Sequence, residues 1–232
     1  MMSRILDTSN CKHCAYRSWA FNKLDQQALE KIDAHKTEVF YEKGEVICTE
    51  GEDVTSFLYL RKGLVKLLTT EKNEKEHIIS IGKPLDFIGL LSIFSNSKHI
   101  YTITAIEDSV VCFVDLEIIK GLMRQNGEFA LDFLEKSSRV ADEVINTRIS
   151  INTKQLRGRI AYILLFFTDH IYGKNEYELP ISRKELAQLI DMSTENVIRI
   201  LSEFRKDKLI EIEGKLIRIL DGQRLQRIYD LG

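Results

Sequence analysis

The segment 181–220 constrains the fold more than any other part of the chain. It reads ISRKELAQLIDMSTENVIRILSEFRKDKLIEIEGKLIRIL. Two short helical patterns are joined by a tight turn, and two strand patterns separated by a Gly follow them. This order predicts a winged helix-turn-helix, in which one short helix enters the major groove of DNA.

Local signals indicate where the two helices begin and which side of the second one faces the core. Ser182 and Glu185 have the spacing of a capping box, which satisfies backbone amides at a helix start. Ser193 or Thr194 is expected to cap the second helix, Thr194–Lys206. Its apolar residues recur at helical spacing and predict a buried stripe of Val197, Ile200, Leu201 and Phe204.

The opposite side of this helix carries side chains suited to base edges. Arg199 can donate two hydrogen bonds to guanine, Glu195 can accept one from cytosine, and Ile198 can touch a thymine methyl group. In the alternative interpretation, Glu195 and Arg199 form only a surface ion pair one helical turn apart. With phosphate contacts from the helix starts and the wing tip, the candidate DNA-binding residues are Ser182, Arg183, Ser193, Thr194, Glu195, Asn196, Ile198, Arg199, Ser202, Lys206 and Lys215.

The N-terminal half has a different pattern. From Thr37 to Asp115, short strand-like runs rich in β-branched and aromatic residues are separated by Gly, which is typical of a β-sandwich or barrel. The pattern then becomes helical. A stripe with alternating steps of four and three predicts a helix that packs along a partner helix in a homodimer, although the same stripe could pack on its own domain. Its residues are Phe133, Ser137, Val140, Val144, Thr147 and Ile151.

Composition bounds the function classes. The net charge is −2, and residues 153–232 carry 14 Lys and Arg against 12 Asp and Glu, so DNA affinity would need local placement of cations and dimerisation. The chain has no apolar run long enough to span a bilayer, and its first residues lack the apolar core of a secretion signal. We therefore expect a cytoplasmic protein without a membrane partner.

Taken together, these motifs resemble the Crp/Fnr family of bacterial transcription regulators over nearly the whole chain. The most specific stretch is 181–199, and EKGEVICTEGE, SFLYLRKGLVKLL and DFIGLLSIF add to it. The resemblance implies an α+β fold with an N-terminal antiparallel β-roll (a double-stranded β-helix like that of cyclic-nucleotide-binding domains), a long dimerisation helix and a C-terminal winged helix-turn-helix.

The resemblance also implies domain limits and partners. We expect an arm at 1–20, a sensory β-roll at 21–125, a dimerisation helix at 126–152 and a winged-helix domain at 153–232. The expected partners are a second copy of the chain, double-stranded DNA with a palindromic site and, as an open alternative, RNA polymerase. By the same resemblance, the base-reading positions are Thr194, Glu195, Ile198 and Arg199.

The β-roll departs from the pattern of cyclic-nucleotide members of the family. Those members carry Gly-Glu followed about ten residues later by Arg-Ser or Arg-Thr, whereas this chain has Gly89-Leu90 and Ile100-Tyr101. A buried phosphate without a cation is costly, so cyclic AMP is not expected as the effector, and a more apolar effector, or none, fits better. The candidate effector pocket is Phe87, Ile88, Gly89, Leu90, Leu91, Ile100 and Tyr101.

The cysteines suggest a second sensory route. Iron–sulfur members of the family use an N-terminal cysteine cluster and one cysteine in the strand before the dimer helix, and Cys11, Cys14 and Cys112 match three of these positions. The fourth thiolate that such a cluster normally needs is missing. A redox site with iron–sulfur or another metal, haem, or purely structural cysteines remain alternatives.

Other function classes receive less support. A metal enzyme of the cupin kind would need clustered ligands in neighbouring strands, but His77 and His99 are isolated in the sequence. No phosphate-binding loop or nucleophile–base motif occurs either. A redox switch built on Cys11 and Cys14 stays open, but the sequence favours a DNA-binding regulator and not an enzyme.

Overall fold

A computed structural model describes residues 4–6, 11–70 and 76–232. The chain divides into two compact units, treated separately below. The β-roll unit comprises Met1–Lys75 and Ile79–Glu143, and the winged-helix unit comprises Glu76–Ile78 and Val144–Gly232. The helix that carries the predicted dimer seam passes from one unit into the other. The predicted arm at 1–20 belongs, in its described part, to the β-roll unit.

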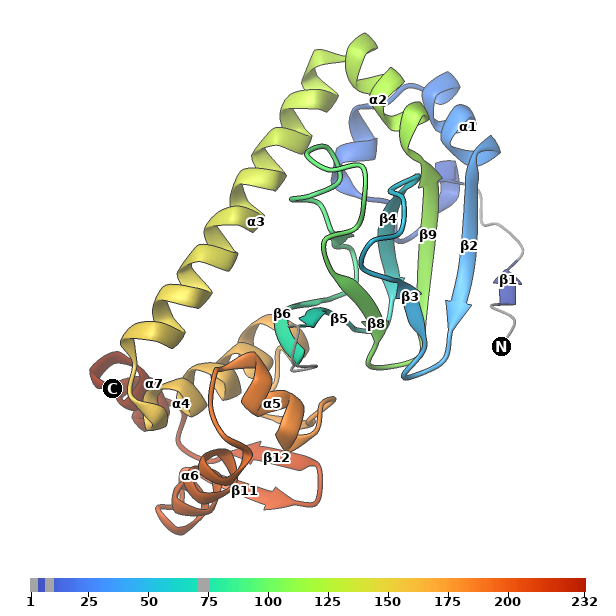
Figure 1. Ribbon diagram of the computed structural model, residues 1–232. Helices are drawn as coiled ribbons and strands as arrows, with labels where there is room; N and C mark the ends of the chain where they lie inside the picture. Colours follow the sequence, from blue (N-terminus) through green and yellow to red (C-terminus); the bar gives the residue numbers. More distant parts are fainter. Residues whose placement is uncertain (1–3, 7–10, 71–75) are drawn as a thin grey trace. The chain divides into compact units, whose positions relative to one another are not determined.

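The β-roll unit is built on two sheets, in which β1 pairs with β2, β2 with β9, β3 with β8, β4 with β7 and β9, and β5 with β8, all antiparallel. One sheet has the order β1-β2-β9-β4-β7 and the other β3-β8-β5-β6 (Figure 1). The strands are β1 (Arg4–Leu6), β2 (Lys36–Tyr41), β3 (Val46–Cys48), β4 (Ser56–Lys62), β5 (Val65–Thr70), β6 (Glu76–Gly82), β7 (Phe87–Ile88), β8 (Thr102–Ala105) and β9 (Ser109–Asp115). The antiparallel β-roll expected from the sequence is therefore confirmed.

The two faces of the five-stranded sheet support different cores, because side chains alternate along a strand. The inner face packs Val39, Leu58 and Val111 into the β-roll interior with Val65 and Ile103 from the other sheet. The outer face is covered by the N-terminal segment, in which the sequence pattern indicated an irregular arm over 1–20 and a helix over 24–32. It forms the 3₁₀ turns η1 (Cys11–His13) and η2 (Trp19–Lys23) and the helix α1 (Gln26–Ala34).

One turn in the β-roll requires glycine for a steric reason. Gly63 joins β4 to β5 with φ of +87°, and a Cβ at this position would lie 2.3 Å from Ser109 Oγ. Any other residue would be strained in φ and would clash. At least one of the glycines that separate the strand-like runs of the sequence is therefore required by the turn it forms.

Two helices follow the β-roll, α2 (Leu116–Gln125) and α3 (Gly127–Thr153). The predicted dimer seam on α3 faces its own chain. Phe133 and Ile151 are buried, and Val140 packs against the core that covers the outer face of the five-stranded sheet. We call this core the outer-face core. The Thr147 hydroxyl lies 2.8 Å from the Tyr162 hydroxyl. The prediction that these residues meet a partner helix is therefore wrong. They pack on their own chain, as the alternative interpretation of the stripe proposed.

The opposite side of α3 carries the exposed apolar residues. They are Leu131, Leu134, Ile145 and Ile149. With the small residues Ser138 and Ala141 between them, they follow the same steps of three and four along the helix. We call this set the exposed α3 stripe.

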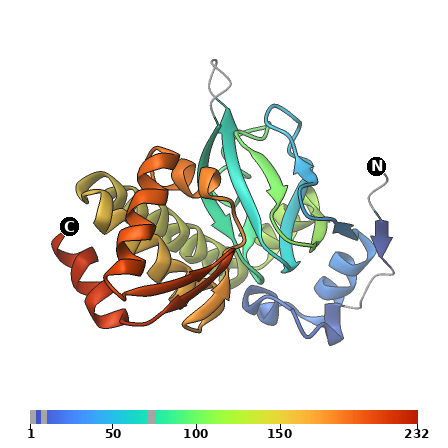
Figure 2. The same ribbon diagram turned by 90° about the horizontal axis from the view of Figure 1, so that it is seen from below.

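The winged-helix unit contains the predicted winged helix-turn-helix. Its elements are α4 (Leu156–Phe166), the π-helical turn η3 (Phe167–Tyr172), β10 (Glu176–Glu178), α5 (Arg183–Leu189), α6 (Thr194–Lys206), β11 (Ile210–Glu213), β12 (Leu216–Ile219) and α7 (Gly222–Leu231). The strands form a sheet of order β10-β12-β11, and Figure 2 shows its red hairpin. None of the described helices is long and apolar enough to cross a membrane.

Candidate DNA-binding site

The helix-turn-helix forms as its local signals indicate. Ser182 Oγ accepts from the Glu185 amide at 3.2 Å, and Glu185 Oε2 accepts from the Ser182 amide at 2.8 Å, which completes the capping box. Ser193, and not Thr194, caps α6, because its hydroxyl accepts from the Asn196 amide. Asp191 adopts a φ of +49° in the turn. Both helix starts thus satisfy their free amides with side chains.

The two sides of α6 differ as predicted. Val197, Ile200, Leu201 and Phe204 are buried. On the other side Glu195, Arg199 and Ile198 are exposed, and Ile198 leaves 55% of its surface in solvent. Thr194, Asn196 and Ser202 are half-buried, while Lys206 is exposed at the end of the helix. The exposed face therefore brings together a carboxylate, an apolar side chain and a guanidinium, the three chemistries that read different base pairs.

The partners of Arg199 differ from the sequence expectation. Its Nη1 donates to Glu203 Oε1 at 2.6 Å, and its Nη2 donates to Asn196 Oδ1 at 3.2 Å. Within the described residues the guanidinium is held by these two side chains and not by Glu195. The predicted Glu195–Arg199 surface pair is therefore replaced by a pair with the residue one turn further along.

Glu195 keeps its own interactions at the start of α6. The hydrogen bond from its own backbone amide and the one from the Ser193 hydroxyl lower the pKa of its carboxyl. The side chain is ionised at neutral pH and faces solvent, so it is available to accept a hydrogen bond. A negative charge in the first turn also suits the helix dipole.

The wing contributes less cationic surface than the sequence suggested. Lys215 is exposed beside Gly214 at the tip of the β11–β12 hairpin. Arg183 is half-buried, and its Nη2 donates to the Gly214 carbonyl at 3.3 Å, while burial lowers the pKa of its guanidinium. Arg183 therefore ties the start of α5 to the wing in addition to any phosphate contact.

Three residues that shape this site, Arg157, Arg159 and Glu203, were missed in the sequence. Arg159 donates to the carbonyls of Ile190 and Asp191, which closes the end of α5 at the turn. Arg157 on α4 donates to Glu203 Oε2 at 2.7 Å. These contacts join residues 31 to 46 positions apart, and neither a helical period nor a capping pattern points to them.

The candidate effector residues of the β-roll are divided between two cores and the surface. Phe87 packs into the outer-face core with Leu90, whereas Ile88 and Tyr101 pack into the β-roll interior. Leu91 and Ile100 are exposed. A Cβ on Gly89 would lie 3.8 Å from the Tyr101 ring. Phe87 and Ile88 cannot face the same side of the sheet, because successive residues of β7 point to opposite faces, and the effector pocket as a whole stays a prediction.

The cysteine positions were tested against an iron–sulfur site. Within residues 4–6, 11–70 and 76–232 there is no group of three His, Cys, Asp or Glu side chains arranged for a metal ion. Lys36 Nζ donates to Cys11 Sγ at 3.2 Å, and burial raises the pKa of the Cys11 and Cys112 thiols to about 12. Metal ligation needs thiolates. Within these residues Cys11, Cys14 and Cys112 thus form no ready group of metal ligands, and an iron–sulfur site stays a prediction.

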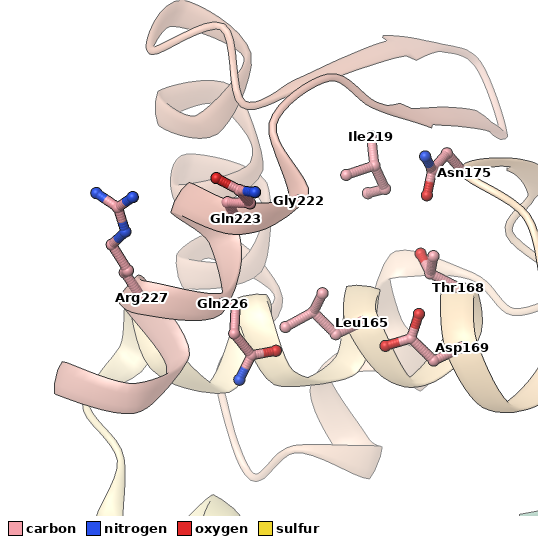
Figure 3. A pocket seen from close by; sticks show the side chains of 9 residues that line it. All are labelled: Leu165, Thr168, Asp169, Asn175, Ile219, Gly222, Gln223, Gln226 and Arg227. Carbon is pink, nitrogen blue, oxygen red and sulfur yellow. The ribbon is translucent and has the colours of Figure 1, made fainter.

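A separate hollow lies in the winged-helix unit, with a volume of about 480 Å³. Figure 3 shows Leu165, Thr168 and Asp169 on one side and α7 on the other, with Arg227 directed away from it. The rest of the lining is Asn175, Ile219, Gly222, Gln223 and Gln226. Three of its six polar side chains are amides, and the others are a hydroxyl, a carboxylate and the Arg227 guanidinium, so the lining singles out no ligand class.

Two family models match the chain. A cyclic nucleotide-binding domain matches residues 38–126, and a Crp-like helix-turn-helix domain matches residues 158–228. The transcriptional activator protein FnrA of Stutzerimonas stutzeri is 25% identical over 92% of this chain and 89% of its own length. The CRP-like cAMP-activated global transcriptional regulator of Mycobacterium tuberculosis is 24% identical over 91% and 96%.

Solved structures show the same fold. FixK2 from Bradyrhizobium japonicum aligns with a TM-score of 0.77 at 21% identity, over 83% of this chain and 96% of its own. A regulator from Eubacterium rectale aligns with a TM-score of 0.74 at 24% identity, over 91% and 98%. Fold and matches together define a regulator with a cyclic-nucleotide-binding-like domain and a helix-turn-helix. The chain belongs to the Crp/Fnr family of transcription regulators and is not an enzyme.

Proposed function

We propose that this regulator acts as a homodimer that binds a palindromic DNA site and reads base edges with the exposed face of α6. The observation that carries the proposal is the exposure of Glu195, Ile198 and Arg199 on one side of a helix whose other side is buried. An isoleucine more than half exposed between two charged residues has little structural use, but it can contact a thymine methyl group. Because the target would be chromosomal DNA, the protein would act in the cytoplasm.

The dimer part of the proposal rests on the exposed α3 stripe. Full burial of one Leu or Ile side chain contributes about 1.5–3 kcal/mol, and the stripe presents four on each chain. Spacing by three and four keeps a stripe facing a partner helix, and the small Ser138 and Ala141 allow close approach. A twofold partner would also place a second α6 on the DNA, one helical turn from the first.

The proposal includes an effector other than cyclic AMP. Leu90 and Tyr101 are buried where cyclic-nucleotide members have Glu and the residue after Arg. Burial of a cyclic phosphate beside these side chains would leave its charge unmatched. The likeness to FnrA, described as a transcriptional activator, further suggests contact with RNA polymerase.

The DNA-binding part is tested by selection from a pool of random duplexes with the full-length protein. We expect recovery of a palindrome whose half-site centres lie about one helical turn apart. Arg199→Ala should then lose about 1–3 kcal/mol of binding free energy and relax the preference at one base pair in each half-site. Equal weakening on every duplex would reduce Arg199 to a phosphate contact, and failure to enrich any palindrome would contradict the proposal.

The dimer part is tested by charge placed on the stripe. Leu134→Glu combined with Ile145→Glu should convert the dimer to a monomer in sedimentation velocity, because two like charges would meet in an apolar interface. The matched control is Arg139→Glu, an exposed position on α3 outside the stripe, which should leave the mass unchanged. A dimer that persists in the double variant would show that the interface lies elsewhere.

A further inference from the structure

Two side chains, Arg157 and Glu203, link α4 to Arg199 in the winged-helix unit. Glu203 accepts from Arg199 Nη1 at 2.6 Å with one carboxylate oxygen and from Arg157 Nη1 at 2.7 Å with the other. Arg157 is itself fixed to α6, because its Nη2 donates to Asp207 Oδ2 at 2.9 Å. Its guanidinium also lies 4.9 Å from the centre of the Phe204 ring. Glu203 is thus held on the side away from Arg199, and its position in turn fixes Arg199.

The exposure of these groups decides what the contacts are for. The side chains of Arg157, Arg199 and Glu203 are between 33% and 55% exposed. Ion pairs at that exposure contribute little to folding stability, because water and salt screen them. A free arginine, however, samples many rotamers, and a ligand that immobilises it must offset that entropy. The contacts from Arg157 through Glu203 to Arg199 therefore affect the conformation of Arg199 more than they affect folding stability.

The geometry leaves Arg199 able to read a base. A guanidinium has five N–H donors, two on each terminal nitrogen and one on Nε. The contacts to Glu203 and Asn196 use one donor on Nη1 and one on Nη2. One N–H remains on each terminal nitrogen, and two donors are what a bidentate contact to guanine O6 and N7 requires. The side chain is held without losing the groups that the contact needs.

We propose that Glu203, anchored by Arg157, is a positioning residue that orders Arg199 for base reading before DNA binds. The inference rests on the proposed function, since it concerns how Arg199 reads its base pair. Glu203 sets specificity without contributing to general affinity, because a carboxylate near the phosphate backbone is repelled by it. Loss of the Glu203 charge therefore lowers discrimination between bases while affinity for unrelated DNA stays the same or rises.

The binding test uses the full-length protein and the duplex that the wild type selects from a random pool. A second duplex carries one substitution at the base pair where Arg199→Ala relaxes the preference. Glu203→Gln should reduce discrimination between the two duplexes by about threefold to tenfold, which corresponds to the ordering of one arginine side chain. Arg157→Lys should act in the same direction but less, since an ammonium group keeps the charge beside Glu203 but not the fixed direction of the guanidinium hydrogen bond.

The matched control is Asp207→Asn. It removes an equal charge from the same helix and from the same arginine, but it leaves the bond between Glu203 and Arg199 intact. Discrimination should stay within about twofold of wild type, the change expected of a screened surface pair. Equal loss in both variants would reveal a general charge effect and overturn the proposal. Unchanged or improved discrimination in Glu203→Gln would overturn it too.

A measurement without DNA tests separately whether Glu203 orders the Arg199 side chain. In ¹⁵N NMR of the full-length protein with labelled arginine, the Arg199 side chain should show hindered guanidinium rotation, and Glu203→Gln should release it. The signal is assigned by its loss in Arg199→Lys. Free rotation in the wild type would overturn the proposal. Failure to select any duplex would instead count against the proposed function, while this measurement still decides the role of Glu203.

Discussion

One charge cluster in the β-roll unit and the ion pairs beside α6 in the winged-helix unit lie in opposite surroundings. In the β-roll unit the side chains of Lys36 and Glu38 are only 3% and 1% exposed, beneath the N-terminal segment. Lys36 contacts Asp33 at 3.1 Å and Glu38 at 3.4 Å, and Glu38 also accepts from Arg61 at 2.5 Å. In the winged-helix unit the corresponding ion pairs lie at the surface, between α4 and α6.

This difference in burial distinguishes charged groups that stabilise the fold from charged groups that can contact a ligand. A buried charge has lost its hydration, so removal of its partner leaves an energetic deficit that the fold must absorb. A surface pair exchanges readily with water and can change partners when DNA approaches. Buried pairs are therefore expected where the chain needs one arrangement, and exposed pairs where side chains must reach a partner.

Glu38→Ala should produce the largest loss of stability. The substitution takes the Glu38 carboxylate away from the buried Lys36 and from Arg61, which should cost about 3–5 kcal/mol of unfolding free energy. Urea denaturation followed by circular dichroism measures this as a lower midpoint at constant slope. Since domains are stable by only about 5–15 kcal/mol, the β-roll unit should unfold well before the wild type.

A double variant provides the control for this experiment. Lys36→Met with Glu38→Leu replaces the charged pair by apolar side chains of similar size, and such replacements are often neutral or stabilising. The double variant should therefore recover most of the stability lost by Glu38→Ala. A loss below about 1 kcal/mol in Glu38→Ala would mean that water reaches the pair, and the contrast between the two units would fail.

The sequence predicted best what short-range rules control. The capping box at Ser182, the second helix and its buried side depend on neighbours within four residues, and the structure has all of them. The order of β-roll, long helix and winged helix likewise follows from changes in the hydrophobic period along the chain. The exposed face with Ile198 and Arg199 could be named for the same reason.

Long-range packing explains what the sequence could not predict. On α3 the stripes through Phe133 and through Leu134 both follow steps of three and four, so the period alone cannot indicate which one meets the core. On β2 the alternation places Lys36 and Glu38 on one face, which reads as a solvent face until the N-terminal segment covers it. The link from Arg157 to Glu203 likewise depends on how α4 packs against α6.

The smallest expected effect, that of Asp207→Asn, tests the other half of the comparison. The Arg157–Asp207 pair spans 2.9 Å, yet both side chains are about two-fifths exposed, and Arg157 keeps its bond to Glu203. The unfolding free energy should fall by less than about 1 kcal/mol, and added salt should shrink the difference, because screening weakens exposed pairs first. Urea titrations at low and high salt measure both.

A loss above about 2 kcal/mol that salt leaves unchanged would mean that this pair supports folding as the buried pair does. The separation between fold-holding charges in one unit and ligand-serving charges in the other would then be untenable.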